Sequence, residues 1–330
     1  MKFGIIGTNK ITDLFIEAGR QHEEFELTSV YSRTEERAKD YAEKHGIPHR
    51  YTDLGAMLES ADVDAVYIAS PNFLHAEQAI RCMEHGKHVL CEKPLASNAA
   101  EVRRMVEASR ANKVVLMEAL KTTLLPNFAA VQQNLHKLGP IRRLFASYCQ
   151  YSSRYDAYKE GTVLNAFNPE YSNGSLMDIG VYCVYPAVVL FGKPQSVKAA
   201  GVMLESGVDG EGSLLLQYES MDAVLMHSKI TNSNLPSEIQ GEHGNMIIHQ
   251  LSVAAKVEIQ YRDGRVEDLS QPQQENTMVY EVEEFIRVAK SGRLESDVNS
   301  HADSLAAMSI MDEARRQLGL VYPADQGSQP

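Results

Sequence analysis

The chain has 330 residues, of which 44% are hydrophobic and 23% are charged; this composition is typical of a globular protein of about two domains and excludes a disordered chain. The net charge of −12 at pH 7 disfavours nucleic acid and anionic membranes as partners, although a few arginines or a helix N-terminus can still hold a small anion. No apolar run approaches the roughly 18 residues of a membrane span, and the apolar strand that starts at Phe3 predicts no cleaved signal peptide. We therefore expect a cytoplasmic protein.

Strand and helix patterns alternate through the first third of the chain. We predict apolar strands over residues 3–6, 25–31, 65–69, 88–91 and 114–117. Helical patterns follow Gly7, run from an N-cap at Thr34 to a stop at Gly46, and cover 74–85 and 98–111. Continuous apolar strands separated by helices indicate an α/β domain, a doubly wound parallel sheet of the Rossmann type with helices on both faces. We place this domain at residues 1–120.

The rest of the chain, residues 121–330, has a different pattern. After a predicted helix over 126–138, strand-like segments dominate, and Asp263-Gly264 is a hairpin signal. The predicted strands cover 143–151, 195–205, 212–219, 223–231, 245–250 and 255–262. Two amphipathic helices are predicted over 278–290 and 303–318, followed by a frayed tail over 323–330. Sequential hairpins favour an α+β domain, an open antiparallel sheet with helices on one face.

The four cysteines are Cys82, Cys91, Cys149 and Cys183. They form no C-x-x-C pair, and their spacing matches no zinc site. We interpret all four as reduced core thiols, which suits a reducing cytoplasm.

The first strand–turn–helix resembles a dinucleotide fingerprint only weakly. Of the pattern G-x-G-x-x-G, only the first glycine is present, because Asn9 and Thr12 replace the other two. Asparagine tolerates positive φ, so Asn9 can still make the tight turn. A pyrophosphate would then bind at the helix N-terminus, and the residues around it would be Gly7, Thr8, Asn9, Lys10 and Ile11. The alternative is a βα turn of another doubly wound fold.

The second strand ends in Ser32-Arg33-Thr34, with Arg37 one turn further on. An NAD-binding protein usually has an acidic residue here for the ribose hydroxyls, and that carboxylate would repel a 2′-phosphate. Arg33 can instead bind the phosphate through two hydrogen bonds and stack on adenine. We therefore predict NADP in preference to NAD, and assign Ser32, Arg33 and Arg37 to the cofactor. A solvated arginine at a strand end is the alternative.

Two more polar turns follow buried strands. The first, after 65–69, contains Ser70, Pro71, Asn72 and His75. Because ligands of open α/β sheets lie beyond the carboxyl ends of the strands, we assign these four residues to the cofactor. The alternative is an ordinary Pro-Asn turn in which His75 caps its helix.

The second polar turn is Glu92-Lys93-Pro94, directly after the strand 88–91. Pro94 favours extended geometry at Lys93, which would hold the ammonium over the crevice. We assign Glu92 and Lys93 to the cofactor site. The alternative is a surface salt bridge at a strand end.

Four segments together resemble the glucose–fructose oxidoreductase / inositol dehydrogenase / rhizopine-catabolism (Gfo/Idh/MocA) family. They are GIIGTNKI at 4–11, SPNFLH at 70–75, HVLCEKPLA at 88–96 and NGSLMDIGVYCV at 173–184. The similarity extends to NTMVYEVEEFIRVAKSG at 276–292. It implies a Rossmann domain followed by an open-sheet domain for substrate binding and oligomerisation, with homodimers or homotetramers formed through that sheet.

The resemblance also implies an activity, the transfer of a hydride between NAD(P) and a carbinol or carbonyl carbon of a sugar, inositol or related polyol. The family's catalytic residues correspond to Lys93, Asp178 and Tyr182, and a cofactor-site tyrosine corresponds to Tyr280. Tyr182, with an unperturbed pKa of about 10, is the candidate general acid/base. Lys93 would favour its phenolate form, and Asp178 would orient Lys93 or a second hydroxyl.

Two alternative functions, neither of them enzymatic, remain open. One is a catalytically silent dinucleotide-binding protein that regulates a partner. The presence of Lys93, Asp178 and Tyr182 together argues against it, because a sensor needs no proton-transfer group. The other is a structural dimerisation protein that uses only the sheet.

Overall fold

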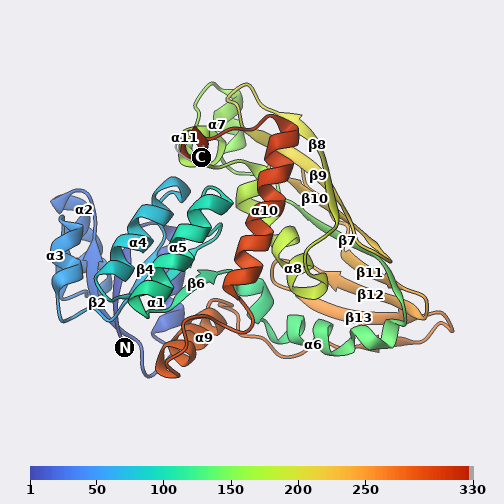
Figure 1. Cartoon of the computed structure of the whole chain (residues 1–330), viewed down its shortest axis with the longest axis horizontal. Helices are drawn as coiled ribbons and strands as arrows, with labels where there is room; N and C mark the ends of the chain where they lie inside the picture. Colours follow the sequence, from blue (N-terminus) through green and yellow to red (C-terminus); the bar gives the residue numbers. More distant parts are fainter. Residues whose placement is uncertain (327–330) are drawn as a thin grey trace. The chain divides into compact units, whose positions relative to one another are not determined.

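The computed structural model describes residues 1–326 and divides into two compact units (Figure 1). Unit 1 comprises Met1–Leu120 and Gln274–His301, and unit 2 comprises Lys121–Gln273 and the chain from Ala302 onward. The predicted boundary at residue 120 puts all later residues in the second domain, whereas the segment 274–301 belongs to unit 1. The chain thus enters each unit twice.

Unit 1 is built on a six-stranded parallel sheet in the order β3-β2-β1-β4-β5-β6, which confirms the predicted Rossmann architecture. The strands are β1 (Lys2–Ile6), β2 (Glu26–Tyr31), β3 (His49–Tyr51), β4 (Ala65–Ile68), β5 (His88–Glu92) and β6 (Leu116–Ala119). The helices between them are α1 (Lys10–Gly19), α2 (Glu35–His45), α3 (Leu54–Glu59), α4 (His75–Glu84) and α5 (Ala99–Asn112). The strand order reverses between β1 and β4, which is where such sheets open a crevice for a ligand.

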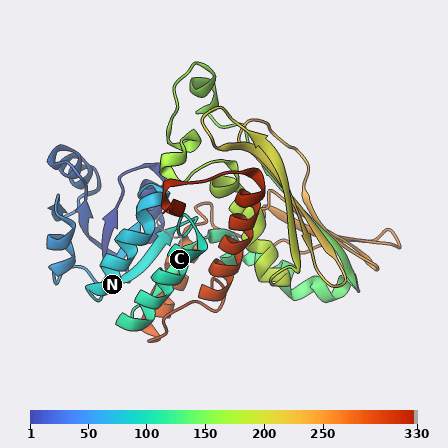
Figure 2. The ribbon, with the colours of Figure 1, turned by 45° about the horizontal axis from the view of Figure 1, so that its top comes forward.

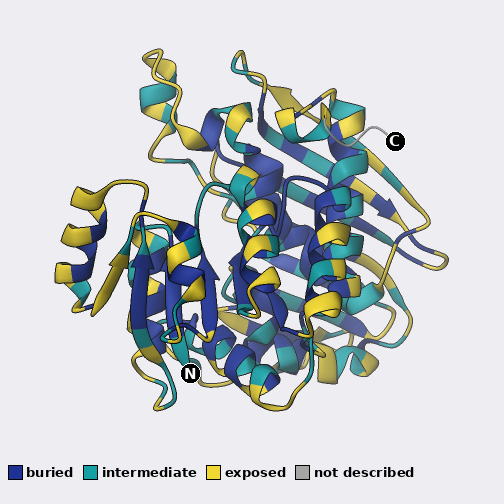
Figure 3. Cartoon of the chain, turned by 60° about the vertical axis from the view of Figure 1, so that its left-hand side comes forward, coloured by how far each residue is buried: buried dark blue, intermediate teal, exposed yellow. Residues whose placement is uncertain are grey.

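The core of unit 1 explains why the segment 274–301 returns to it. Phe285 lies on helix α9 (Val279–Lys290), is fully buried, and packs against Phe3 of β1 with ring centroids 5.8 Å apart. Burial of one such ring contributes about 1.5–3 kcal/mol. The Asn299 amide also donates hydrogen bonds to the carbonyls of Glu118 and Leu120 at the end of β6. In Figure 3 the Rossmann strands are largely buried, and exposed residues lie mainly on helices and loops.

Unit 2 is built on an eight-stranded sheet in the order β14-β13-β12-β11-β7-β10-β9-β8. The strands are β7 (Ile141–Cys149), β8 (Ser196–Met203), β9 (Asp209–Gln217), β10 (Asp222–Ser228), β11 (Ser237–Gly241), β12 (Gly244–His249), β13 (Lys256–Tyr261) and β14 (Val266–Asp268). All pairs are antiparallel except β7 with β10, which are parallel. The predicted open sheet is therefore confirmed, but β11 and β14 were not predicted, and β11 separates β7 from β12.

Helices cover one face of this sheet. They include α6 (Pro126–Asn134), α8 (Val181–Phe191) and α10 (His301–Leu318), and Figure 1 shows α6 and α8 lying along the sheet. The apolar segment Pro169–Phe191 is long enough to cross a membrane by length and composition, but 72% of its apolar window is buried within the structure. That burial is typical of a core helix.

The end of the chain differs from the prediction of a frayed tail. Pro323–Gln326 form the short helix α11, and residues 327–330 lie outside the described part of the chain. The Asp325 carboxylate pairs with the buried Arg315 guanidinium at 2.7 Å and accepts a hydrogen bond from the Tyr322 amide. This charged contact holds the helix against α10, and nothing in the local pattern of apolar residues reveals it.

The four cysteines are free thiols. Cys82, Cys91 and Cys183 are buried, as predicted, and burial raises the pKa of the Cys82 thiol to about 12. Cys149 is an exception, because it is half-exposed at the end of β7 and lines a surface cavity with Ser147.

Candidate active site

The topology of unit 1 gathers the predicted cofactor residues at one edge of the sheet. Strands β1, β4 and β5 are neighbours and run parallel. The turns that follow them are the turn at Gly7, the turn at Ser70 and the turn at Glu92. The carboxyl ends of parallel strands share one edge, so these three turns lie at the edge where the strand order reverses and where sheets of this kind bind a ligand. We call this position the crevice of unit 1.

Gly7 makes the tight turn after β1. Its φ is +107°, and a Cβ atom there would lie 2.5 Å from the carbonyl oxygen of Ala69. Only glycine allows this close approach of the turn to the end of β4. The prediction that Asn9 adopts the positive φ is wrong: Asn9 is extended, with φ −113°.

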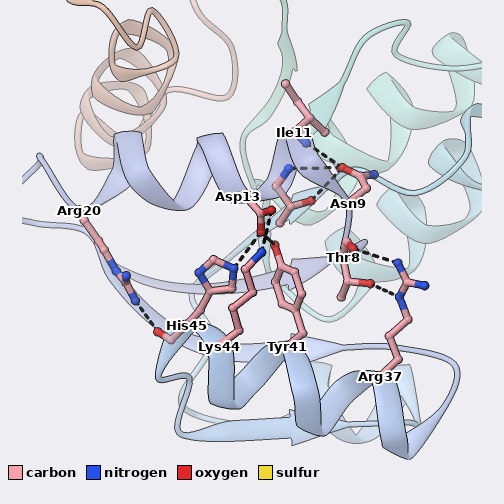
Figure 4. Close-up of polar contacts among 10 residues, drawn as sticks. Thr8, Asn9, Ile11, Asp13, Arg20, Arg37, Tyr41, Lys44 and His45 are labelled. Carbon is pink, nitrogen blue, oxygen red and sulfur yellow. Dashed lines mark hydrogen bonds and ion pairs between the residues drawn. The ribbon is translucent and has the colours of Figure 1, made fainter. Parts of the chain in front are cut away.

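Asn9 instead caps helix α1 (Figure 4). Its side-chain oxygen accepts hydrogen bonds from the amides of Ile11 at 3.0 Å and Thr12 at 3.3 Å, and its amide donates to the Ala69 carbonyl at 2.8 Å. One side chain therefore fixes the start of the helix and ties it to β4. A helix N-terminus carries partial positive charge and suits a phosphate group.

Asp13 braces α1 against α2 behind this turn (Figure 4). Its carboxylate accepts hydrogen bonds from the Tyr41 hydroxyl and the Lys44 ammonium, both at 2.8 Å. Burial acts to raise the pKa of Asp13, but these hydrogen bonds and that of His45 outweigh it and lower the pKa to about 2. The brace thus fixes α2, the helix that carries Arg37.

Two exposed guanidinium groups follow β2. Arg33 comes directly after the buried Ser32, and Arg37 lies in the first turns of α2. The Arg37 Nε donates to the Thr8 hydroxyl at 2.6 Å, and its terminal nitrogen donates to the Thr8 carbonyl at 3.0 Å (Figure 4). The structure therefore places a cation beside the βα turn.

His75 connects the two remaining turns. It is buried, with one ring nitrogen 2.8 Å from the Ser70 carbonyl and the other 3.0 Å from the Pro94 carbonyl. A neutral imidazole can donate to only one of these carbonyls at a time, and burial lowers the pKa of His75. His75 lies behind the turns and braces them, while Pro71 and Asn72 are half-buried at the surface of the same turn.

Hydrogen bonds to buried side chains hold the Glu92-Lys93 turn in place. The Glu92 carboxylate is buried and accepts a hydrogen bond from the Tyr67 hydroxyl at 2.7 Å, while Lys93 is half-buried. The peptide bond between Lys93 and Pro94 is cis. The amide of Leu95 donates to the buried Glu118 carboxylate at 3.0 Å. Glu118 was not among the predicted site residues, because it directly follows the predicted strand over 114–117 and its partner Leu95 lies in another turn.

Tyr280 also belongs to unit 1. It lies in the first turn of α9, is half-buried, and its hydroxyl accepts a hydrogen bond from the Gln274 amide at 2.8 Å. The residue therefore helps fix the point where the chain returns to this unit.

Unit 2 carries the other two predicted catalytic residues. Asp178 lies in a π-helical turn, Leu176–Gly180, that leads into α8, and Tyr182 lies in the first turn of α8. Two residues four positions apart share one face of a regular α-helix, whereas the wider π turn alters the angle between Asp178 and Tyr182. Such turns occur frequently at functional sites. The Tyr182 ring packs edge-on against Tyr148 of β7, with centroids 5.6 Å apart.

The ionic partner of Asp178 was not predicted from the sequence. The Lys229 ammonium, just beyond β10, forms an ion pair with the Asp178 carboxylate. A signal for it existed, because Ala223, Leu225 and His227 alternate on the covered face of β10 and Lys229 continues that series. A lysine at a covered position needs a counter-charge.

A buried polar cluster holds the segment that precedes Asp178. Asp209, at the start of β9, accepts a hydrogen bond from the Leu176 amide at 2.7 Å, and the Ser175 hydroxyl lies 2.9 Å from His227 Nδ1. Burial raises the pKa of Asp209 to about 6 and lowers the pKa of His227 to about 3. His227 is therefore neutral at physiological pH.

The residues of the unit 1 crevice fit a dinucleotide. The capped N-terminus of α1 suits the pyrophosphate, the missing Cβ at Gly7 lets the main chain come close, and Arg33 and Arg37 supply positive charge for a further phosphate. No acidic residue occupies the end of β2, where it would repel that phosphate.

Comparison with known proteins agrees with this geometry. Residues 1–120 match the oxidoreductase family with an NAD-binding Rossmann fold, and residues 133–247 match the Gfo/Idh/MocA C-terminal domain. The scyllo-inositol 2-dehydrogenase (NADP(+)) IolU of Bacillus subtilis is 59% identical over 326 residues, 99% of each chain. The uncharacterised oxidoreductase YgjR of Escherichia coli is 47% identical over 98% of each chain.

The structure also resembles a solved enzyme. The 3-ketoreductase KijD10 of Actinomadura kijaniata, in complex with NADP and TDP-benzene, has a TM-score of 0.83 to this chain at 26% identity. The match covers 96% of this chain and 97% of the other.

Proposed function

This chain belongs to the Gfo/Idh/MocA oxidoreductase family, and from that premise we propose that it is an NADP-dependent dehydrogenase of scyllo-inositol or a closely related polyol. As a member of the family it is an NAD(P)-dependent enzyme that acts on CH–OH groups. The observation that carries the proposed substrate and cofactor is the 59% identity to the NADP-dependent scyllo-inositol 2-dehydrogenase over 99% of both chains.

The proposed cofactor site uses the crevice of unit 1. The pyrophosphate would lie at the N-terminus of α1, beside Gly7, Thr8, Asn9, Lys10 and Ile11. Arg33 and Arg37 would bind the 2′-phosphate and thereby select NADP, with Ser32 supporting the turn. Ser70, Pro71, Asn72, Glu92 and Tyr280 would complete the site, and His75 would hold two of its turns in place.

The proposed chemistry assigns one task to each catalytic residue. When bound, the dinucleotide accepts or supplies the hydride at the nicotinamide ring. Tyr182 takes the proton of the substrate hydroxyl during oxidation and returns it during reduction. The Lys93 ammonium stabilises the negative charge that develops on the substrate oxygen. Asp178, an acceptor when ionised, binds a second hydroxyl of the polyol.

We further propose a cytoplasmic homo-oligomer that pairs through the uncovered face of the large sheet. The support is two exposed apolar side chains that the register places on one face of neighbouring strands at its edge, Val202 of β8 and Leu215 of β9. Such patches mark association surfaces. Light scattering of the purified protein should give a mass above 36.7 kDa, and a monomer would refute this part.

The experiment for the function is a cofactor-reduction assay. Purified protein is mixed with NADP⁺ or NAD⁺ and a panel of inositols, sugars and aromatic diols, and the absorbance of the reduced cofactor is recorded. The expected result is turnover with scyllo-inositol and NADP⁺. Tight NADP⁺ binding without turnover on any panel member would refute the proposal and favour a regulatory role.

A further inference from the structure

Lys229 is a buried cation in unit 2. The residue is only 4% exposed, and its ammonium pairs with the Asp178 carboxylate. The Phe167 ring covers it, with the ring centroid 5.7 Å from Nζ. Phe167 belongs to a small apolar cluster with Val208 and Tyr155. Tyr155 begins the short helix α7 (Tyr155–Lys159), and Figure 2 shows the green segment of the chain around this helix projecting beyond the end of the sheet. Shielding from water makes the ion pair strong and its loss costly.

The main chain on the N-terminal side of Asp178 is held independently of Lys229. Asp209 accepts the hydrogen bond of the Leu176 amide, and the Ser175 hydroxyl bonds to His227. The Tyr322 hydroxyl donates to the Asn173 carbonyl at 2.8 Å. These contacts fix where the turn begins, but none of them touches the Asp178 carboxylate.

Lys229 itself has a fixed position. Its amide donates to the Gly210 carbonyl at 2.9 Å, which continues the pairing of β10 with β9, and its carbonyl accepts from the Ser152 amide at 2.8 Å. A main chain held on both sides limits the positions that the ammonium can reach. The ion pair therefore couples a rigid strand end to a half-exposed carboxylate.

We propose that Lys229 is a positioning residue for the hydride-transfer reaction, which holds the Asp178 carboxylate in the direction of the substrate. This inference rests on the proposed function, in which Asp178 binds a second hydroxyl of the polyol. An adjacent ammonium favours the ionised form of a carboxylate. An ionised carboxylate only accepts hydrogen bonds, so a substrate hydroxyl can donate to it.

A double-mutant cycle tests the proposal. The four proteins are the wild type, Lys229→Met, Asp178→Asn and the double variant, and the readout is kcat/KM for scyllo-inositol with NADP⁺. Each single change should lower kcat/KM by about 10–100-fold, the range expected for a hydrogen bond to a charged group. Because Lys229 acts through Asp178, the double variant should lose no more than the more impaired single variant. KM for NADP⁺ should stay within about twofold, since the cofactor site lies in the other unit.

The matched control is Lys137→Met. Lys137 forms an ion pair with Glu267 at 2.5 Å in the same unit, so this change removes a lysine–carboxylate pair without touching Asp178. It should leave kcat/KM unchanged. If Lys229→Met does not fold, the cycle is run with Lys229→Arg, which keeps the charge but displaces it. Its loss should appear with Asp178 present and vanish once Asp178→Asn is introduced.

The outcomes separate this inference from the function on which it rests. Wild-type kcat/KM in Lys229→Met, or losses that multiply in the double variant, would overturn the positioning role alone. Wild-type activity in Asp178→Asn would overturn the role of Asp178 and the inference with it. Absence of turnover in the unmodified enzyme would refute the proposed function.

Discussion

The crevice of unit 1 and the Asp178 turn of unit 2 are built in different ways. Around the crevice, each polar group lies within a few residues of a strand end, and many of its contacts are to main-chain atoms of neighbouring turns, as for Asn9 and His75. The Asp178 turn is held by side chains that come from far along the chain, namely Asp209, His227 and Lys229.

The difference has a physical origin. A dinucleotide is bound largely through phosphate and ribose groups, which a helix N-terminus and main-chain amides can recognise. Proton transfer requires a side chain with a defined charge and direction, and a buried polar network can provide both. The crevice is therefore expected to tolerate single changes better than the Asp178 turn does. The predictions below test that contrast.

The largest effect is expected for Tyr182→Phe. Removing the hydroxyl deletes the proposed proton acceptor, so kcat should fall by about 10²–10⁴-fold while NADP⁺ binding stays intact. Steady-state kinetics measure kcat, and titration with the cofactor measures NADP⁺ binding. The control is Tyr218→Phe, which removes a hydroxyl that bonds to the Gly192 carbonyl and should leave kcat unchanged. Undiminished turnover in Tyr182→Phe would remove this residue from the mechanism.

A smaller effect, on selectivity, is expected for Arg33→Ala. Loss of a charged hydrogen-bond donor to the 2′-phosphate should reduce the ratio of kcat/KM for NADPH to that for NADH by about 10–100-fold. The matched control is Arg50→Ala, an exposed arginine that pairs with Glu35, for which no change in the ratio is expected. An unaltered preference in Arg33→Ala would leave the 2′-phosphate without its assigned ligand.

The third prediction concerns stability as a function of pH. Burial lowers the pKa of His227 to about 3 from 6.5. Below pH 6.5 the His227 imidazole therefore binds a proton in the unfolded chain but stays neutral in the folded chain. The free energy of unfolding falls as the pH drops below 6.5. In His227→Gln this loss is absent. Between pH 8 and pH 5 the wild type should therefore lose about 2 kcal/mol more of its free energy of unfolding than the variant does.

Urea denaturation at several pH values measures this shift. The Asp209 carboxyl, with its pKa raised to about 6 by burial, is present in both proteins and contributes to both curves. Parallel pH profiles for the two proteins would show that His227 is not held neutral in the folded state.

The smallest effect is expected for Asn9→Ala in the crevice. Loss of a helix cap costs about 1 kcal/mol, and here the hydrogen bond to the Ala69 carbonyl is lost as well. Thr34→Ala is the matched control, because Thr34 occupies the N-cap position of α2 without a side-chain capping bond. Its free energy of unfolding should stay within about 0.5 kcal/mol of the wild-type value. Equal losses in the two variants would contradict the assigned cap.

The same contrast explains what could be predicted from the sequence. Parallel strands, the turns after them and the helices between them are local patterns, so the Rossmann sheet was predicted apart from its three-residue edge strand β3, and so were the positions of its polar turns. The large sheet was predicted in outline, because its strands alternate apolar and polar residues. The strand β11 was missed, since its five residues, Ser237–Gly241, include only one large apolar side chain.

What the sequence does not reveal depends on contacts between distant residues. Phe285 returns the segment 274–301 to unit 1, and the Arg315–Asp325 pair orders the predicted tail. Lys229 was overlooked because its partner lies 51 positions away. Asn9 was assigned a positive φ from its residue type, whereas Gly7 alone supplies the turn and leaves Asn9 free to cap α1.

The most direct test of the proposed reaction is to follow the hydrogen that is transferred. Scyllo-inositol deuterated at its ring carbons is incubated with NADP⁺ and the enzyme, and the reduced cofactor is examined by NMR and mass spectrometry. The proposed mechanism predicts one deuterium at C4 of the nicotinamide ring for each substrate oxidised. Reduced cofactor without deuterium, or no reduction at saturating substrate, would contradict it.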